Sequence, residues 1–257
     1  MPLLHKFQEH NFQNGFQTKD SILRTVHYDP EVIFIGTYNH GWSWNQSDFY
    51  YGRNMFMWTV LANLFLHNHN HHSSPRNEGN EEPTFNQLFE ICKKGKLIFA
   101  DIVKGINENI IAIEQNEQQN VLVNNQYLWS TYQDRPLDYM ASEGWLDDNV
   151  EAIIKYINAT ASIKDIYFTF KTGAWLVNKL NKICNGVRHG VTYGSIFTPT
   201  ANGFGKPLLP PFHEKAWGLA HCWVWNGINH SIPVDKPNYV NLDHHWLIEK
   251  GVTPANF

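Results

Sequence analysis

Neutral amide, imidazole and phenol side chains gather in one short stretch of the chain. Tyr38, Asn39 and His40 follow closely on Gly36, and Tyr51 comes a little further on. The carbonyl oxygen of an Asn can hold a water molecule, and an imidazole can hold water or donate a proton. Aromatic rings offer faces on which a planar group can stack. This stretch therefore combines stacking faces, hydrogen-bonding edges and a candidate water-holding group.

Asp101 is a second candidate for handling water. It follows a predicted buried strand directly, and a carboxylate can take a proton from water without help. An Asp at such a position more often caps the next element of structure. We prefer the capping role for Asp101 and keep water activation as the alternative.

The elements that position these residues follow from the apolar pattern. Short apolar runs predict strands at residues 31–36, 96–103, 165–170 and 194–198, and helical spacing predicts helices at residues 55–66, 85–93, 149–159, 173–184 and 214–225. Strands that alternate with helices favour an α/β fold with a mostly parallel central sheet. Because ligands of such sheets bind beyond the carboxyl ends of the strands, we expect the loops after Ile35, Phe170 and Phe197 to meet at one site.

The chain of 257 residues is expected to form a single domain spanning 1–257. Residues 1–28 are polar with scattered Phe and are interpreted as a covering arm. Surface inserts are expected at 67–84 and 107–145, and a C-terminal extension from about 227.

Composition narrows the function classes. The net charge is −4 and the charged fraction is 17%, which excludes a strongly basic nucleic-acid binder, so any contact with DNA must use a local patch. A hydrophobic content of 42% with 14% aromatic residues excludes wholesale disorder. The N-terminus has no apolar run of signal length, no stretch approaches membrane-spanning length, and the three cysteines form no CxxC pair. We expect a cytoplasmic protein with reduced thiols and no membrane contact.

A histidine-rich run, His67, His69, His71 and His72, suggests a metal site. A structural zinc site needs ligands held rigidly, usually from two ordered segments. All four histidines lie in one low-complexity run without a partner Cys, so we prefer a solvated loop and expect no metal and no cofactor.

Four motifs in a fixed order carry a family resemblance. They are Gly36-Thr-Tyr-Asn39-His40-Gly41, Tyr51-Gly52-Arg53-Asn54-Met-Phe56-Met-Trp58, Phe168-Thr169-Phe170-Lys171 and Thr198-Pro199-Thr200-Ala201-Asn202. From about residue 25 to residue 220 the chain resembles the uracil-DNA glycosylase superfamily, closest to its hypoxanthine and mismatch-specific thymine/uracil branches. His40 stands where that family usually has a Pro. The resemblance implies an α/β three-layer sandwich with a central four-stranded, mainly parallel sheet flanked by helices, and hydrolysis of the N-glycosidic bond to a flipped-out base.

The resemblance also implies roles for the first loop. Asn39 is expected to position the attacking water, and His40 to hold that water or to donate to the departing base. The alternative is that both side chains stabilise the turn. Tyr38 and Tyr51 are expected to contact the extruded base, Tyr51 because Gly52 leaves space beside it. Asn54 suits recognition of a base edge, and equally an N-cap for the helix that follows.

Contacts with DNA are expected from the later loops. Thr198, Thr200 and Asn202 are expected to bind phosphates or the minor groove through hydroxyl and backbone N–H groups. Arg53, Lys171 and Lys206 are candidates for cationic phosphate contacts.

The leading hypothesis is therefore a monofunctional DNA glycosylase that acts as a monomer, with DNA as its partner and no obligate protein partner. The first loop has no evident nucleophilic Lys, which disfavours a lyase mechanism. The alternative is a glycosylase-like nucleic-acid-binding module without turnover. An α/β-hydrolase-like enzyme acting on a small nucleoside is weaker still, because the chain has no G-x-S-x-G elbow.

Overall fold

The fold is taken from a computed structural model. It describes residues 3–42, 45–52, 55–69, 71, 82–107, 112–115, 120–123, 126–129, 135–170, 173–199, 215–224 and 239–256.

A seven-stranded mixed sheet forms the centre of the molecule, with the strand order β13-β12-β5-β6-β4-β3-β2. Its parallel strands are β5 (Val32–Gly36), β6 (Leu97–Asp101), β12 (Asp165–Phe168) and β13 (Thr192–Ser195). Its antiparallel strands are β2 (Glu9–Asn11), β3 (Gln17–Lys19) and β4 (Ile22–Thr25). Every residue of β5 and β6 is buried, which confirms the two strands predicted from apolar runs.

The expected four-stranded, mainly parallel sheet is wrong. Residues 9–25 fall in the predicted covering arm, but they form three antiparallel strands that extend the sheet beyond β6. In β3 only the middle residue, Thr18, is buried. The residues of β2 are all exposed, and β4 buries only Ile22 and Leu23. None of the three strands therefore has an apolar run of the length that identifies strands buried on both faces.

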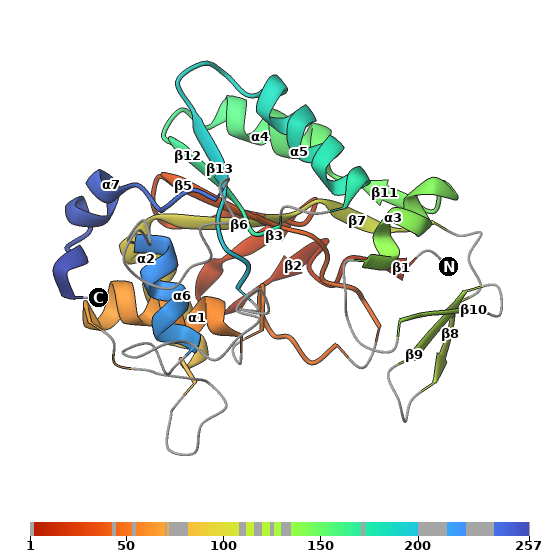
Figure 1. Cartoon of the computed structure of the whole chain (residues 1–257), viewed down its shortest axis with the longest axis horizontal. Helices are drawn as coiled ribbons and strands as arrows, with labels where there is room; N and C mark the ends of the chain where they lie inside the picture. The colour runs from red at the N-terminus through yellow and green to blue at the C-terminus, as the bar shows by residue number, and fades with distance from the viewer. Residues whose placement is uncertain are drawn as a thin grey trace.

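Helices cover the parallel strands on both faces. Figure 1 shows α4 (Val150–Ala159) and α5 (Ala174–Gly186) together on one face, and α1 (Phe56–Ala62), α2 (Phe85–Gly95) and α6 (Lys215–Val224) on the other. These five helices correspond to the five predicted from the sequence. The helix predicted to reach residue 66 continues past α1 as a π-helical turn, η2 (Asn63–His67).

The strand predicted at 96–103 divides into two. After β6 the chain leaves the main sheet at Ile102 and continues as β7 (Val103–Ile106), which pairs with β1 (Leu3–Leu4) and β11 (Leu146–Asp148) in a small antiparallel sheet. This division brings the N-terminal residues beside the carboxyl end of β6.

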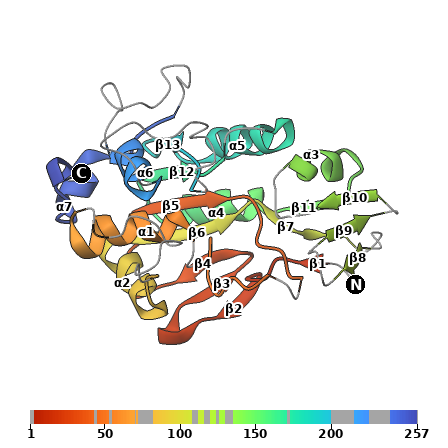
Figure 2. The ribbon, with the colours of Figure 1, turned by 60° about the horizontal axis from the view of Figure 1, so that its bottom comes forward.

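The predicted insert at 107–145 contains structure of its own. Strands β8 (Ala112–Gln115), β9 (Asn120–Val123) and β10 (Gln126–Trp129) form a third antiparallel sheet, followed by α3 (Arg135–Ser142). Figure 2 shows this sheet at the end of the molecule where the N-terminus lies. Of the insert predicted at 67–84, residues 70 and 72–81 lie outside the described residues.

The last described segment returns to the sheet. This segment contains helix α7 (His244–Glu249) and a short 3-10 turn, η3 (Pro254–Asn256). A similar 3-10 turn, η1 (Gln13–Gly15), lies near the N-terminus. The indole of Trp246 donates to the Gly95 carbonyl, and Lys250 forms an ion pair with Glu31.

The three cysteines are all unpaired thiols. Burial raises the pKa of Cys222 to about 12 and that of Cys184 to about 11. Among the residues that the structure describes, no helix has both the length and the apolar content needed to cross a membrane.

Candidate functional site

The carboxyl ends of three parallel strands meet at one edge of the sheet. Gly36 and Asp101 are register partners at the ends of β5 and β6. Thr169 follows β12 directly, and its N–H donates to the Ile35 carbonyl over 3.0 Å. We use the name strand-end cluster for a group of five residues: His5, Asn39, Tyr51, Asp101 and Thr169.

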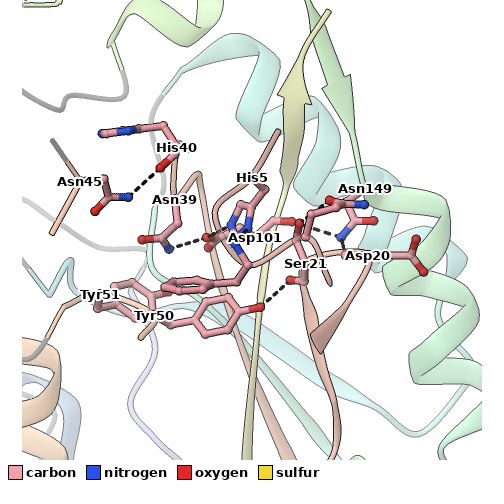
Figure 3. Close-up of polar contacts among 12 residues, drawn as sticks. His5, Asp20, Ser21, Asn39, His40, Asn45, Tyr50, Tyr51, Asp101 and Asn149 are labelled. Atoms are coloured by element: carbon pink, nitrogen blue, oxygen red, sulfur yellow. Dashed lines mark hydrogen bonds and ion pairs between the residues drawn. The ribbon is translucent and has the colours of Figure 1, made fainter. Parts of the chain in front are cut away.

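The carboxylate of Asp101 lies at the centre of this cluster. It is 2% exposed, and its Oδ2 accepts hydrogen bonds of 2.7 Å from Asn39 Nδ2 and 2.7 Å from His5 Nε2 (Figure 3). Both donors are side chains from distant parts of the sequence, and neither is the N-terminus of a helix. The capping role that we preferred for Asp101 is therefore wrong, and water activation by Asp101 stays a prediction.

The hydrogen bonds of His5 define its tautomer. The backbone N–H of Phe7 donates to His5 Nδ1 over 3.0 Å, so Nδ1 is an acceptor and Nε2 carries the proton. The Nε2–H group then donates to Asp101. His5 is fully enclosed, at 3% exposure, with the rings of Phe7, Tyr38 and Tyr50 around it.

Asn39 is oriented by Asp101. Since the carboxylate only accepts, it selects the NH₂ side of the amide, and the carbonyl oxygen of Asn39 lies on the opposite side. Within the part of the chain that the structure describes, that oxygen accepts no hydrogen bond. Asn39 is half-buried, so the oxygen is available to a water or a ligand.

Gly36 allows two polar groups to approach the end of β5. A Cβ at this position would lie 2.4 Å from Asp101 Oδ1 and 2.7 Å from Tyr51 Oη. The Tyr51 hydroxyl also hydrogen-bonds Thr169 Oγ1 over 3.0 Å, and Thr169 Oγ1 donates to the Ile35 carbonyl over 3.3 Å. Tyr51 is half-buried and has a φ of 65°, a left-handed conformation that costs about 1 kcal/mol or more for a residue with a side chain.

Two neighbouring rings belong to the core. Phe49 and Tyr50 are fully buried, and the Tyr50 hydroxyl donates to the Ser21 carbonyl over 2.8 Å. The same carbonyl accepts the Asp101 N–H over 3.3 Å. Burial raises the pKa of Tyr50 well above its usual value. Tyr50 thus holds the Ser21 carbonyl that binds the last residue of β6.

Tyr38 and His40 are both buried in the loop that follows β5. Tyr38 is 2% exposed, burial raises its pKa, and its hydroxyl donates to the Leu3 carbonyl over 3.2 Å. His40 is 2% exposed with its ring 4.8 Å from that of Trp42, and Figure 3 shows it pointing away from Asp101. Burial, with smaller effects of Lys6 and His5, lowers the pKa of His40 to about 3. A neutral imidazole is a weak proton donor, so the geometry does not favour His40 as an acid for a departing base.

Most of the residues expected to contact DNA lie outside the described residues: Arg53, Asn54, Lys171, Thr200, Asn202 and Lys206. Thr198 is described and is half-buried. The residue before it, Phe197, is fixed by the Trp223 indole, which donates to its carbonyl over 2.9 Å, and by a ring contact with Tyr239. Thr198 therefore starts its loop from a fixed position.

The histidine-rich run offers no metal centre in the described part of the chain. The rings of His67 and His71 stack 4.1 Å apart, and His69 Nδ1 contacts the His67 carbonyl over 2.6 Å. No three His, Cys, Asp or Glu side chains among the described residues are placed to share a metal ion. His72 lies outside them.

His5 is a site residue that the sequence patterns do not indicate. It is a single histidine in a polar segment with no periodic pattern, and its partner lies 96 positions away. Thr169 lies in the third motif, Phe168–Lys171, and the resemblance implies no role for it. For Asp101, the feature that indicates a site residue is its position as an acidic residue at the end of a buried strand.

Comparison of the chain with protein-family models, curated proteins and solved structures gives no match.

Proposed function

We propose that this protein is a monofunctional DNA glycosylase that hydrolyses the N-glycosidic bond of a damaged or modified base. The observation that carries the proposal is the oriented Asn39 amide, whose NH₂ group is bound by Asp101 and whose carbonyl oxygen is left available. The order of the four sequence motifs supports the same chemistry.

The reaction passes through a sugar with oxocarbenium character, attacked by water. The enzyme must hold that water and stabilise the positive charge on the sugar. In our proposal the side-chain carbonyl oxygen of Asn39, Oδ1, holds the water. The Asp101 carboxylate, buried behind Asn39, supplies negative potential that favours the cationic sugar.

Tyr51 is the proposed contact for the extruded base. Its side chain lies over Gly36, between the carboxyl ends of β5 and β12. Of the two tyrosines expected to contact the base, Tyr51 is the half-buried one, whereas Tyr38 is 2% exposed. A ring stacked on a base contributes about 1–3 kcal/mol. We therefore keep Tyr51 in the proposed site and leave Tyr38 to packing.

The proposed leaving-group chemistry uses neutral donors. His40 is neutral over the physiological range because its pKa is lowered to about 3. We therefore propose that hydrogen bonds from hydroxyl and amide groups, rather than an imidazolium, stabilise the charge on the departing base. Asn54 and the loop from Thr198 to Asn202 remain proposed contacts for the base and the phosphates.

The experiment is a panel of duplex and single-stranded oligonucleotides carrying uracil, hypoxanthine, xanthine, oxidised pyrimidines and bulky modified cytosines. Each is incubated with excess protein and then treated with alkali, which cleaves abasic sites. We expect alkali-dependent product from at least one base, and no covalent product after borohydride treatment. No product from any substrate overturns the enzymatic proposal, and tight binding without product would then favour the binding module.

A further inference from the structure

We infer that His5 is a positioning residue for Asn39, acting through Asp101, and that the N-terminal segment thereby completes the proposed active site. This inference rests on the proposed function. His5 is not proposed to touch the substrate, because it is 3% exposed and enclosed by aromatic rings.

His5 can donate a hydrogen bond only to Asp101. Its Nδ1 is occupied by the Phe7 N–H, which leaves Nε2–H as its single donor, and this donor is directed at Asp101 Oδ2. The same oxygen accepts from Asn39. Two donors on one oxygen fix the rotation of the carboxylate about its side-chain bond, and the carboxylate in turn fixes the plane of the Asn39 amide. Without His5, Asp101 Oδ2 keeps Asn39 as its single described donor.

The backbone around His5 connects β7, the strand that follows Asp101, to the loop that carries Asn39. The His5 N–H donates to the backbone carbonyl of Lys104 over 2.9 Å, and the Lys6 N–H donates to the backbone carbonyl of Asn39, not to its side chain, over 2.7 Å. We call residues 3–7 the N-terminal strap. It joins the strand that follows Asp101 to the loop that holds Asn39.

Two glycines make room for the N-terminal strap. A Cβ at Gly41 would lie 2.6 Å from the Leu4 carbonyl oxygen, and one at Gly105 would lie 2.9 Å from that of Leu3. Both contacts are with backbone atoms, which cannot rotate away as a flexible side chain would. The strap is therefore held closely on both sides, so His5 approaches Asp101 in a defined position.

A pair of substitutions separates the two hydrogen bonds of His5. In His5→Gln the amide nitrogen can take the place of Nε2 and donate to Asp101, whereas in His5→Asn the shorter side chain can accept from Phe7 but cannot reach Asp101. We expect His5→Asn to lower kcat for base release about 10- to 100-fold with little change in KM, because a small displacement of a catalytic group has effects of this size. We expect His5→Gln to keep most of the wild-type kcat.

The matched control is His27→Asn, which changes an exposed histidine that contacts the Asn14 carbonyl and does not belong to the strand-end cluster. Thermal unfolding is measured for all three variants. If His5→Gln is as slow as His5→Asn, or if the rates follow the unfolding temperatures, the positioning role is overturned while the proposed function stands.

Hydrogen exchange of the Asn39 side-chain amide provides a readout that needs no substrate. Its signals are identified by their loss in Asn39→Ala, and we expect exchange to become faster in His5→Asn than in His5→Gln. If wild-type protein releases no base, the proposed function fails, and this measurement decides the inference alone. Equal exchange in the two variants overturns it.

Discussion

The side-chain amide of Asn39 donates a 2.7 Å hydrogen bond to Oδ2 of Asp101, which lies 62 positions further along the chain. This bond orients the amide, because a carboxylate can accept from its NH₂ group but offers nothing to its carbonyl oxygen. It joins the loop after β5 to the end of β6. The proposed chemistry depends on this pairing and on the groups around it.

The space above Gly36 is predicted to be essential for the cluster. In Gly36→Ala the new methyl group meets Asp101 Oδ1 at 2.4 Å and Tyr51 Oη at 2.7 Å, so at least one of them must move. We expect a loss of about 1–3 kcal/mol in the free energy of unfolding, as for other overpacked interiors, together with a large fall in base release. Urea unfolding and a single-turnover assay measure the two effects.

Gly144→Ala is the control for that substitution. Gly144 has a φ of 74°, and a Cβ added there would have nothing within 4 Å, so Ala introduces backbone strain without a clash. It is expected to lower stability and to leave base release unchanged. Full activity in Gly36→Ala would show that the close approach of Asp101 and Tyr51 has no role in the reaction.

Tyr51 is predicted to act through its ring more than through its hydroxyl. Tyr51→Phe removes the 3.0 Å hydrogen bond to Thr169, which we expect to cost about 1 kcal/mol of stability while binding of the modified DNA is kept. Tyr51→Ala also removes the ring and is expected to weaken that binding roughly tenfold or more. Both variants keep a residue with a side chain at φ 65°, so backbone strain is matched between them. Equal affinity of the two variants in a fluorescence binding assay would exclude stacking by Tyr51.

His40 is predicted to make stability depend on pH below neutrality. Its pKa is about 3 in the folded protein, below the usual 6.5, so between these values the unfolded chain binds a proton that the folded protein does not. The contribution of neutral His40 to the free energy of unfolding is therefore complete above about pH 6.5 and is lost as the pH falls toward 3. We expect wild-type stability to fall by about 1.4 kcal/mol per pH unit more steeply than that of His40→Gln between pH 6 and pH 4. Urea unfolding at several pH values gives both slopes, with His27→Gln as the control, and parallel curves for wild type and His40→Gln would contradict a buried neutral His40.

Sequence patterns predicted the parts of the fold that are buried on both faces. The apolar runs that form β5 and β6, and the helical spacing in α4, are direct consequences of burial in an α/β layer. The strands between residues 9 and 25 were missed because they are short and largely polar. All three residues of β2 are exposed, only Thr18 of β3 is buried, and the buried part of β4 is just Ile22 and Leu23.

The candidate site was predicted in part. Asn39, Tyr51 and Asp101 were recognised because their types and their places after strands suggested chemistry. The preferred role of Asp101 was wrong, since its actual donors are side chains brought together by tertiary structure. His5 could not be predicted, because nothing in its polar segment indicates that this segment pairs with β7. The burial of His40 depends on the N-terminal strap crossing its loop, which the local sequence also does not show.

The most direct test is the rate of base release by wild type and Asn39→Ala under single-turnover conditions, on the best substrate of the oligonucleotide panel. The free base is measured by mass spectrometry, and DNA affinity is measured in parallel. We predict release of the free base by wild type, a rate at least about 10²-fold lower in Asn39→Ala because a positioned group is lost, and affinity that changes little. Equal rates in the two proteins, or no release by wild type, would contradict the account.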